Sequence, residues 1–207
     1  MIIDKLKKDS NISVQVMDSL EDEIITVYAK NTEADFVDQD SAIRLKKLES
    51  DWILYKVQRG QEFLIKEFSD ELLAKLALFV SVSREFSSAG ANNDVREELR
   101  ALTSNLDKAD KCIGDEIGSA YYSFFENKVD CINLKRREID RYDIYYLSPT
   151  GDVAMISEDR KLPNALVVVY NFSFILKQFK EVIYPELIAY NLSPNQLELL
   201  KRIYLKK

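Results

Sequence analysis

The sequence contains no histidine, and this absence excludes several kinds of functional site. Histidine is the commonest general base and the commonest metal ligand, so Ser-His-Asp and Cys-His catalysis and His-containing zinc sites are excluded. Carboxylate chemistry stays open because the chain has 35 Asp and Glu residues, although such a scatter is usually a solvated surface. The chain shows no Gly-rich phosphate loop, nucleophile elbow or metal-ligand spacing. We therefore predict no enzyme, no catalytic residue, and no metal or cofactor site.

Cysteine, glycine, proline and long apolar runs are also scarce. Cys112 and Cys131 are too few for a disulfide framework and fit reduced, partly buried thiols. No apolar run approaches the ~20 residues of a membrane span, because Lys75 interrupts the longest helical candidate. The first residues carry charges where a signal peptide needs an apolar core. We expect a cytoplasmic protein that binds neither membrane nor nucleic acid directly.

Negative charge is concentrated in residues 18–40, where eight acidic residues accompany one base, Lys30. This segment has a net charge of −7 and the whole chain has −6, so the remainder sums to +1. The segment is either a solubilising face or a surface for a basic partner. The second interpretation predicts a binding site made of these acids and one exposed aromatic residue: Asp18, Glu21, Asp22, Glu23, Glu33, Asp35, Phe36, Asp38 and Asp40.

Residues 51–79 form the stretch around which the chain is organised. Two runs rich in aromatic and β-branched residues flank Gly60, which is the signal for a β-hairpin. After Phe68 the period changes to that of a helix, with Ser69 as a possible cap and Leu72, Leu76 and Phe79 on one face. Residues 42–48 alternate and suit a preceding strand. We predict a three-stranded meander followed by a helix over residues 69–86.

A similar pattern recurs about ninety residues later. Residues 43–51 match residues 132–140, and after a shift of two residues Ile53 aligns with Ile144, Gly60 with Gly151 and Ala74 with Ala165. The alternative is a chance similarity between β-rich segments. The predicted fold class is α+β: two similar antiparallel meander-plus-helix units joined by a long amphipathic helix. The predicted divisions are residues 1–90, 91–128 and 129–207, with one continuous domain as the alternative.

Helical spacing predicts the remaining elements. Apolar residues recur three and four apart from Val95 to Phe124, so we predict one helix over residues 94–127, able to seal a junction or pair with another helix. Residues 12–28 are mixed: Ile12, Val16, Leu20 and Ile24 follow helical spacing, whereas the composition after residue 24 is that of a strand. We favour a helix there, and further helices after Pro163 and Pro194.

The hairpin and the helix after it also carry a motif, W-x-x-Y-x-x-x-R-G followed by F-x-x-E-x-x-A. Its residues are Trp52, Tyr55, Arg59, Gly60, Phe68, Glu71 and Ala74. This pattern resembles immunity proteins of bacterial polymorphic toxin systems, including those of contact-dependent growth inhibition, over residues 42–80. The second unit has Asp143 and Thr150 where the first has the tryptophan and the arginine, which leaves open whether both halves derive from such a module.

The resemblance implies a cytoplasmic bacterial protein that binds a cognate toxin domain, in many cases a nuclease with a basic cleft, and blocks its active site or substrate access. We expect a monomer that binds the toxin one to one, with the acidic segment as the binding surface. Electrostatic complementarity would mainly raise the association rate. The alternative function is a non-catalytic scaffold or adaptor protein that oligomerises through the helix predicted at residues 94–127.

Overall fold

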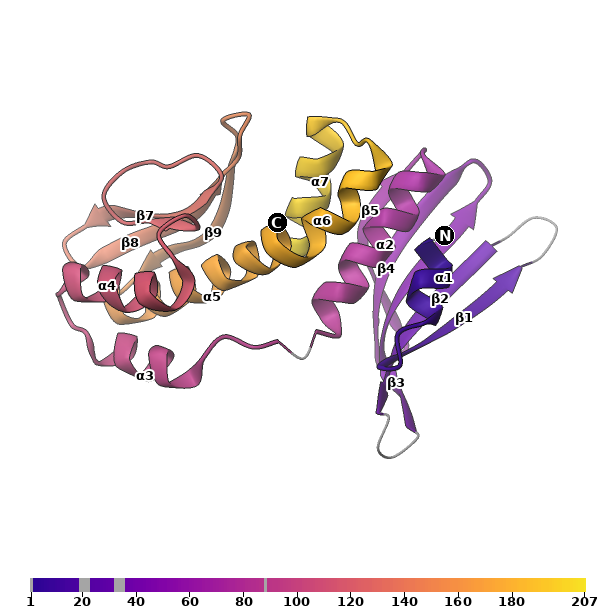
Figure 1. Ribbon diagram of the computed structural model, residues 1–207, viewed down its shortest axis with the longest axis horizontal. Coiled ribbons are helices and arrows are strands. Elements are labelled where there is room, and N and C mark those ends of the chain that lie inside the picture. The colour runs from indigo at the N-terminus through magenta and orange to yellow at the C-terminus, as the bar shows by residue number, and fades with distance from the viewer. Residues whose placement is uncertain (1, 19–22, 32–35, 88) are drawn as a thin grey trace. The chain divides into compact units, whose positions relative to one another are not determined.

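The computed structural model describes residues 2–18, 23–31, 36–87 and 89–207. The protein is α+β, as the sequence predicts, with a five-stranded antiparallel sheet and a four-stranded mixed sheet (Figure 1). The chain divides into two compact units, of which one comprises Met1–Ser88 and Leu192–Tyr204 and the other Ala89–Asn191 and Leu205–Lys207. The last helix thus lies mainly in the first unit, although residues 89–191 of the second unit precede it in the sequence.

In the first unit, five strands follow one another as an up-and-down meander, so each strand pairs with the next. The prediction of a strand at residues 42–48 followed by a hairpin is confirmed. The elements are α1 (Ile2–Lys7), β1 (Ile12–Asp18), β2 (Glu23–Asn31), β3 (Phe36–Leu48), β4 (Asp51–Gln58), β5 (Gln61–Phe68), α2 (Glu71–Glu85) and α7 (Pro194–Leu205).

The β4–β5 hairpin forms because its two-residue loop tolerates left-handed backbone. Gln58 pairs with Gln61, and the intervening Arg59 and Gly60 have φ of 50° and 78°. Positive φ at both loop residues matches the twist of the flanking strands. Next along the chain, Asp70, rather than the expected Ser69, caps α2 by accepting a hydrogen bond of 2.6 Å from the Leu73 N–H.

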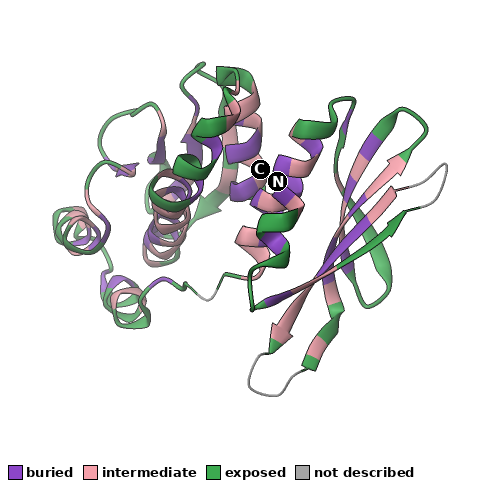
Figure 2. Ribbon diagram, turned by 45° about the vertical axis from the view of Figure 1, so that its right-hand side comes forward, coloured by how far each residue is buried: buried purple, intermediate pink, exposed green. Residues whose placement is uncertain are grey.

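One face of the five-stranded sheet forms the core of the first unit. Ile25 pairs with Leu45, and Leu45 pairs with Leu54, and all three side chains are fully buried. Trp52 lies on this face at 3% exposure, and the Lys75 ammonium of α2 lies 5.0 Å from the centre of its ring. Figure 2 shows buried positions on the inner strands, whereas exposed positions gather at the strand ends. The helix side of the sheet therefore holds the tryptophan of the motif in the core.

The second unit repeats the order of meander and helix. It contains α3 (Asn93–Ala101), α4 (Leu106–Ile117), β6 (Tyr122–Ser123), β7 (Cys131–Glu138), β8 (Arg141–Leu147), β9 (Val153–Arg160), α5 (Leu162–Gln178), a π-helical turn (Phe179–Ile183), α6 (Tyr184–Leu187) and a 3₁₀ turn (Ile188–Tyr190). β7, β8 and β9 pair antiparallel, and β6 adds to β7 in parallel. The second hairpin and the helix after Pro163 are thus confirmed.

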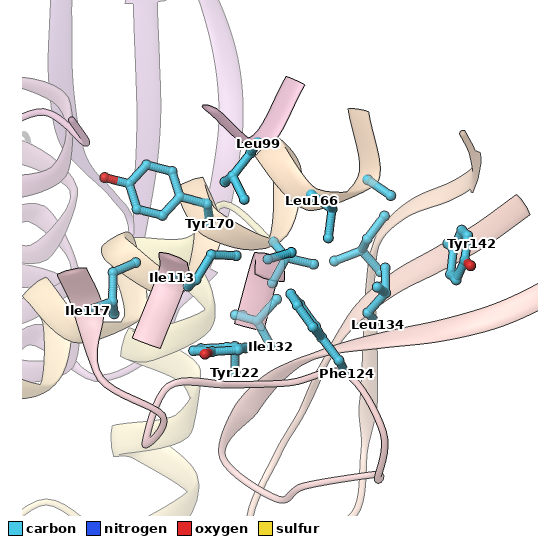
Figure 3. Packing of buried hydrophobic residues seen from close by; sticks show 14 of the residues in the cluster. Leu99, Ile113, Ile117, Tyr122, Phe124, Ile132, Leu134, Tyr142, Leu166 and Tyr170 are labelled. Carbon is cyan, nitrogen blue, oxygen red and sulfur yellow. The ribbon is translucent and has the colours of Figure 1, made fainter. Parts of the chain in front are cut away.

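The core of the second unit lies between α5, the sheet and the two helices α3 and α4. Ile132 and Leu134 of β7 point toward Leu166 of α5, while Leu99 and Ile113 approach from α3 and α4 (Figure 3). Tyr170 is fully buried, and its hydroxyl accepts a hydrogen bond of 2.9 Å from the backbone N–H of Asn92. This bond fixes the start of α3 against the middle of α5.

A π-helical turn separates α5 from α6, because Pro185 is tolerated in the first turn of α6 but not in the interior of an α-helix. Proline lacks an N–H, and its ring clashes with the carbonyl four residues earlier, here that of Glu181. The Tyr184 N–H instead bonds the Phe179 carbonyl five residues back, which widens the turn. Two side-chain contacts link this turn to the segment that contains β6 and precedes β7. Lys180 pairs with Asp130 at 2.7 Å, and Tyr121 donates a 2.7 Å hydrogen bond to Glu181.

No helix within the described ranges is long and apolar enough to cross a membrane.

The prediction of one helix over residues 94–127 is wrong. The structure has two shorter helices, α3 and α4, and then an irregular segment that contains β6. α3 ends in a tight turn at Leu102, and the Asn105 side chain begins α4 by accepting a 2.9 Å hydrogen bond from the Lys108 N–H. Asn favours such a cap over the interior of a helix. The apolar stripe is buried as expected, but the long oligomerisation helix of the scaffold hypothesis is absent from these described residues.

The prediction of a helix over residues 12–28 is also wrong, because β1 and β2 occupy its described part. Residues four apart share a face of a strand as well as a face of a helix, so the spacing of Ile12, Val16 and Ile24 did not distinguish the two. The β-branched composition after residue 24 did indicate a strand, and Ile25 and Val27 are fully buried within β2. Leu20 lies outside the described residues.

In the middle strand, the alignment of the two meanders made from the sequence is displaced by one residue from the one that the strand pairing gives. Leu45 pairs with Leu54 in the first sheet, and Leu134 pairs with Ile144 in the second. Ile144 therefore corresponds to Leu54, not to Ile53, which lies on the opposite face of its sheet. The same register places Tyr142, not Asp143, at the position of Trp52.

Candidate partner-binding surface

The predicted acidic site is divided between the two ends of β2. Asp18 and Glu23 face each other where β1 meets β2, whereas Phe36 pairs with Asn31 at the other end. β2 has nine residues, so these ends lie about 26 Å apart along the strand. The structure therefore does not bring the described members of the predicted site, Asp18, Glu23, Phe36, Asp38 and Asp40, into one cluster. Four of the nine lie outside the described residues: Glu21, Asp22, Glu33 and Asp35.

A groove adjoins the first of these ends, and we call it the α1–α2 groove. Its volume is about 600 Å³, and it is open to solvent. Apolar side chains from α1, β1 and α2 mix in its lining with two acids and two lysines. The lining residues are Ile2, Ile3, Lys7, Val16, Glu23, Glu71, Leu72 and Lys75. Of the five predicted binding residues that the structure describes, Glu23 alone contributes to this groove.

Lys75 is the electrostatic centre of the groove. Its ammonium lies 2.7 Å from the Glu71 carboxylate and 3.4 Å from that of Glu23, above the ring of Trp52. Partial burial lowers the pKa of Lys75, but the hydrogen bond to Glu71 and the charge of Glu23 outweigh it, and the net pKa is raised. The two carboxylates and this ammonium sum to −1, and Lys7 brings the charge of the described lining to zero.

Leu72 shows what the sequence missed. Its spacing from Leu76 and Phe79 predicts a core position, but its side chain is 43% exposed and lines the groove, whereas Leu76 is buried. Helical periodicity identified the correct face of α2 but not where the neighbouring elements stop covering it. Ile2 and Ile3 of α1 complete the apolar lining.

At the other end of β2, an irregularity in β3 presents two of the acids. Tyr28 pairs with Ala42, and the next residue, Ala29, pairs with Asp38, so residues 39–41 have no partner on β2. The Asp38 carboxylate accepts a 2.9 Å hydrogen bond from the Asp40 N–H, and the Asp40 carbonyl accepts one of 2.7 Å from the Arg59 N–H. Phe36 is 61% exposed at this end. An exposed aromatic thus lies on the same strand as two exposed acids.

The face of the sheet opposite the core carries a polar network that the sequence did not indicate. Glu62 accepts hydrogen bonds from Arg44 at 2.6 Å and Lys46 at 2.7 Å, and Arg44 also donates to the Thr26 hydroxyl at 3.0 Å. Partial burial raises the pKa of Glu62, but the two cations more than offset this and hold it below its ordinary value. Lys46 also lies 5.4 Å from the ring centre of Tyr55, a residue of the motif.

The motif residues themselves have structural positions. Trp52, Phe68 and Ala74 are buried, and Arg59 and Gly60 form the hairpin turn. The part of the chain that the structure describes holds no group of three or more Cys, Asp or Glu side chains placed to share a metal ion.

No protein-family model, no curated protein and no solved structure matches this chain.

Proposed function

We propose that this protein is a toxin-neutralising immunity protein, which acts in the bacterial cytoplasm without catalysis or a cofactor of its own. It binds the basic domain of a cognate toxin, such as a nuclease, and blocks its active site or substrate access. The α1–α2 groove carries this proposal, because it combines an apolar lining with an acidic edge at the β1–β2 end. The resemblance of the motif to immunity proteins of polymorphic toxin systems agrees with it.

The groove offers the two components that a tight interface needs. Affinity requires an anchor that is removed from water, usually a large apolar or aromatic side chain. Ile3, Val16 and Leu72 can receive such an anchor. Glu23 and Glu71, with Asp18 exposed at the end of β1, can attract basic residues around it and raise the association rate. A toxin segment with an apolar residue flanked by Lys or Arg has the matching chemistry.

The second acidic end is a separate candidate contact. Phe36 can act as an aromatic anchor, and Asp38 and Asp40 can attract basic residues. The separation of about 26 Å between the two ends of β2 fits within the width of one toxin domain. One partner could therefore contact both ends, and each end can be tested by itself.

We also propose that the two meander–helix segments are copies of one module. Ile43 and Ile132 occupy equivalent buried positions in the first strands. Ala74 and Ala165 are both fully buried at the fourth position of the following helices. Gly60 and Gly151 both have positive φ between the second and third strands. Within the proposed binding groove, Glu71, Leu72 and Lys75 belong to α2 of the first copy, whereas the rest of its lining comes from α1, β1 and β2, which precede the module.

The test is co-expression with the toxin domain encoded directly upstream of this gene, followed by co-purification and a growth assay. We expect a stoichiometric complex that survives moderate salt and restores growth. Leu72→Ala should weaken binding about tenfold, because it removes apolar contact from an exposed helix position. Leu48→Ala is the matched control, since Leu48 is also 43% exposed but lies outside the groove lining.

Charge reversal separates the two acidic ends. Asp18→Lys and the double variant Asp38→Lys/Asp40→Lys should slow association at low salt and leave the fold intact, because all three residues are exposed. Glu126→Lys, an exposed reversal in the second unit, is the control. Association kinetics at low salt that none of these changes alters would exclude the acidic segment as the binding site. If no complex forms at all, the proposed function fails.

A further inference from the structure

Among the described residues no strand pairs with the outer edge of β1, and the strand itself lacks the residues and the bulge that normally protect such an edge. Within the described part of the chain β1 pairs with β2 alone, at the margin of the sheet (Figure 1). Proteins usually block an exposed edge with Pro, Lys, a bulge or a covering segment, because its free N–H and C=O groups bind other strands. β1 has no Pro, Lys or Arg, and its seven residues pair with β2 without a register shift.

The opposite edge of the same sheet is protected. β5 contains Glu62, Lys66 and Glu67, and its register with β4 shifts so that Ile65 faces no residue of β4. Such a bulge twists an edge and interrupts its regular pattern of hydrogen-bonding groups. Although Phe63 and Leu64 are exposed on β5, that edge is therefore a poor template for pairing. The contrast identifies β1 as the edge available to another strand.

We propose that β1 pairs antiparallel with β1 of a second copy of this chain, which joins two five-stranded sheets into one. A two-fold axis at Gln15 pairs all seven residues of the strand. It places Val14 opposite Val16 of the other copy on one face, and Ser13 opposite Met17 on the other. Ile12 to Met17 are uncharged, and Asp18 faces Ile12, so no like charges meet. This self-complementarity favours a second copy over an unrelated strand.

The exposure of the apolar residues supports the same occupant. Val16 is 41% exposed and Met17 is 63% exposed, and both gain a cross-strand partner in this arrangement. Val16 also lines the α1–α2 groove, so the paired strand runs beside that groove. The free protein is therefore a dimer at sufficient concentration, which departs from the monomer expected from the sequence. This inference does not depend on the toxin.

The test is sedimentation velocity of the full chain alone over a wide concentration range. We expect a reversible monomer–dimer equilibrium. Gln15 is exposed on β1, so Gln15→Lys and Gln15→Glu each place two like charges opposite one another without disturbing the core. Each should raise the dimer dissociation constant about tenfold. An equal mixture of the two variants should regain the wild-type dimer, because it pairs Lys with Glu across the axis.

Gln61→Lys is the matched control, since Gln61 is an exposed glutamine on the other edge strand. It should leave the equilibrium unchanged, and circular dichroism should show that all variants keep the fold. A wild-type protein that stays monomeric at every concentration overturns the proposal. So does a mixture of Gln15→Lys and Gln15→Glu that fails to regain the dimer, or a dimer that Gln61→Lys weakens as much as Gln15→Lys.

Discussion

Glu62 of β5 joins two cations of β3 on the face of the sheet opposite the core. Its carboxylate contacts Arg44 and Lys46, and its side chain is 26% exposed. Partly exposed ion pairs contribute little individually, but one carboxylate shared by two cations forms a small network. The network lies across β3 and β5, which flank β4 in the sheet, so it links three strands. The network stabilises the fold only while the Glu62 carboxyl is ionised.

We predict that Glu62→Gln lowers the free energy of unfolding by about 1 kcal/mol at pH 7. The pKa of Glu62 is lowered in the folded protein, so its stabilisation is present above the unfolded value of 4.5 and is lost as pH falls through the folded pKa. Urea unfolding at pH 7 and pH 3 measures the free energy of unfolding of the wild type and the variant. The difference between the two proteins should be smaller at pH 3 than at pH 7. Glu67→Gln, an exposed change on the same strand, is the control. A difference that widens toward pH 3 contradicts the assignment.

Asn105 separates α3 from α4, and it explains why periodicity predicted the wrong element there. Leu99, Ala109 and Ile113 are all fully buried in one core, as the apolar stripe indicates. The stripe could be predicted because burial depends on the identity of side chains. Periodicity alone does not show the break, because the break depends on a single capping hydrogen bond that competes with a helical one. The sequence carried the signal in Thr103, Ser104 and Asn105, whose residue types favour turns and caps.

The same reasoning applies to the candidate site. The meander, its turn and α2 follow from local patterns at residues 42–86, and the structure has them there. The prediction treats the acidic segment as one site because its residues are close in the sequence, but a strand of nine residues separates its ends. The groove beside it could not be predicted, because it arises where α1, β1 and α2 meet without filling the space between them.

Replacing the cap tests this account of the two helices. Asn105→Ala should lower the free energy of unfolding by about 1 kcal/mol, because the Lys108 N–H loses its partner at the start of α4. Thermal unfolding followed by circular dichroism measures the change. Asn164→Ala, an exposed change in the first turn of α5, is the control and should be close to neutral. If Asn105→Ala is as neutral as the control, the cap does not maintain the break.

The two units are interleaved in the sequence, because the chain leaves the first unit at residue 88 and returns to it at Leu192. The stability of the first unit therefore depends on α7, which lies near the C-terminal end of the described chain. Leu200 is fully buried, Tyr204 is 4% exposed, and the Arg84 guanidinium of α2 lies 6.0 Å from the centre of the Tyr204 ring. Burial raises the pKa of Tyr204, which keeps its phenol neutral at physiological pH. A change in α7 should thus act on the sheet near the N-terminus.

Trp52 makes this testable, because it is the single tryptophan of the chain and it lies in the core of the first unit. Tyr204→Ala should reduce the free energy of unfolding reported by Trp52 fluorescence by about 3 kcal/mol, since it deletes a large buried side chain. Tyr170→Ala deletes an equally buried tyrosine in the second unit, so it should shift the transition seen by circular dichroism and leave that of Trp52 nearly unchanged. Equal shifts of the Trp52 transition in both variants would mean that the two units unfold together. A unit that is compact in the native state can still depend on the other unit for its stability.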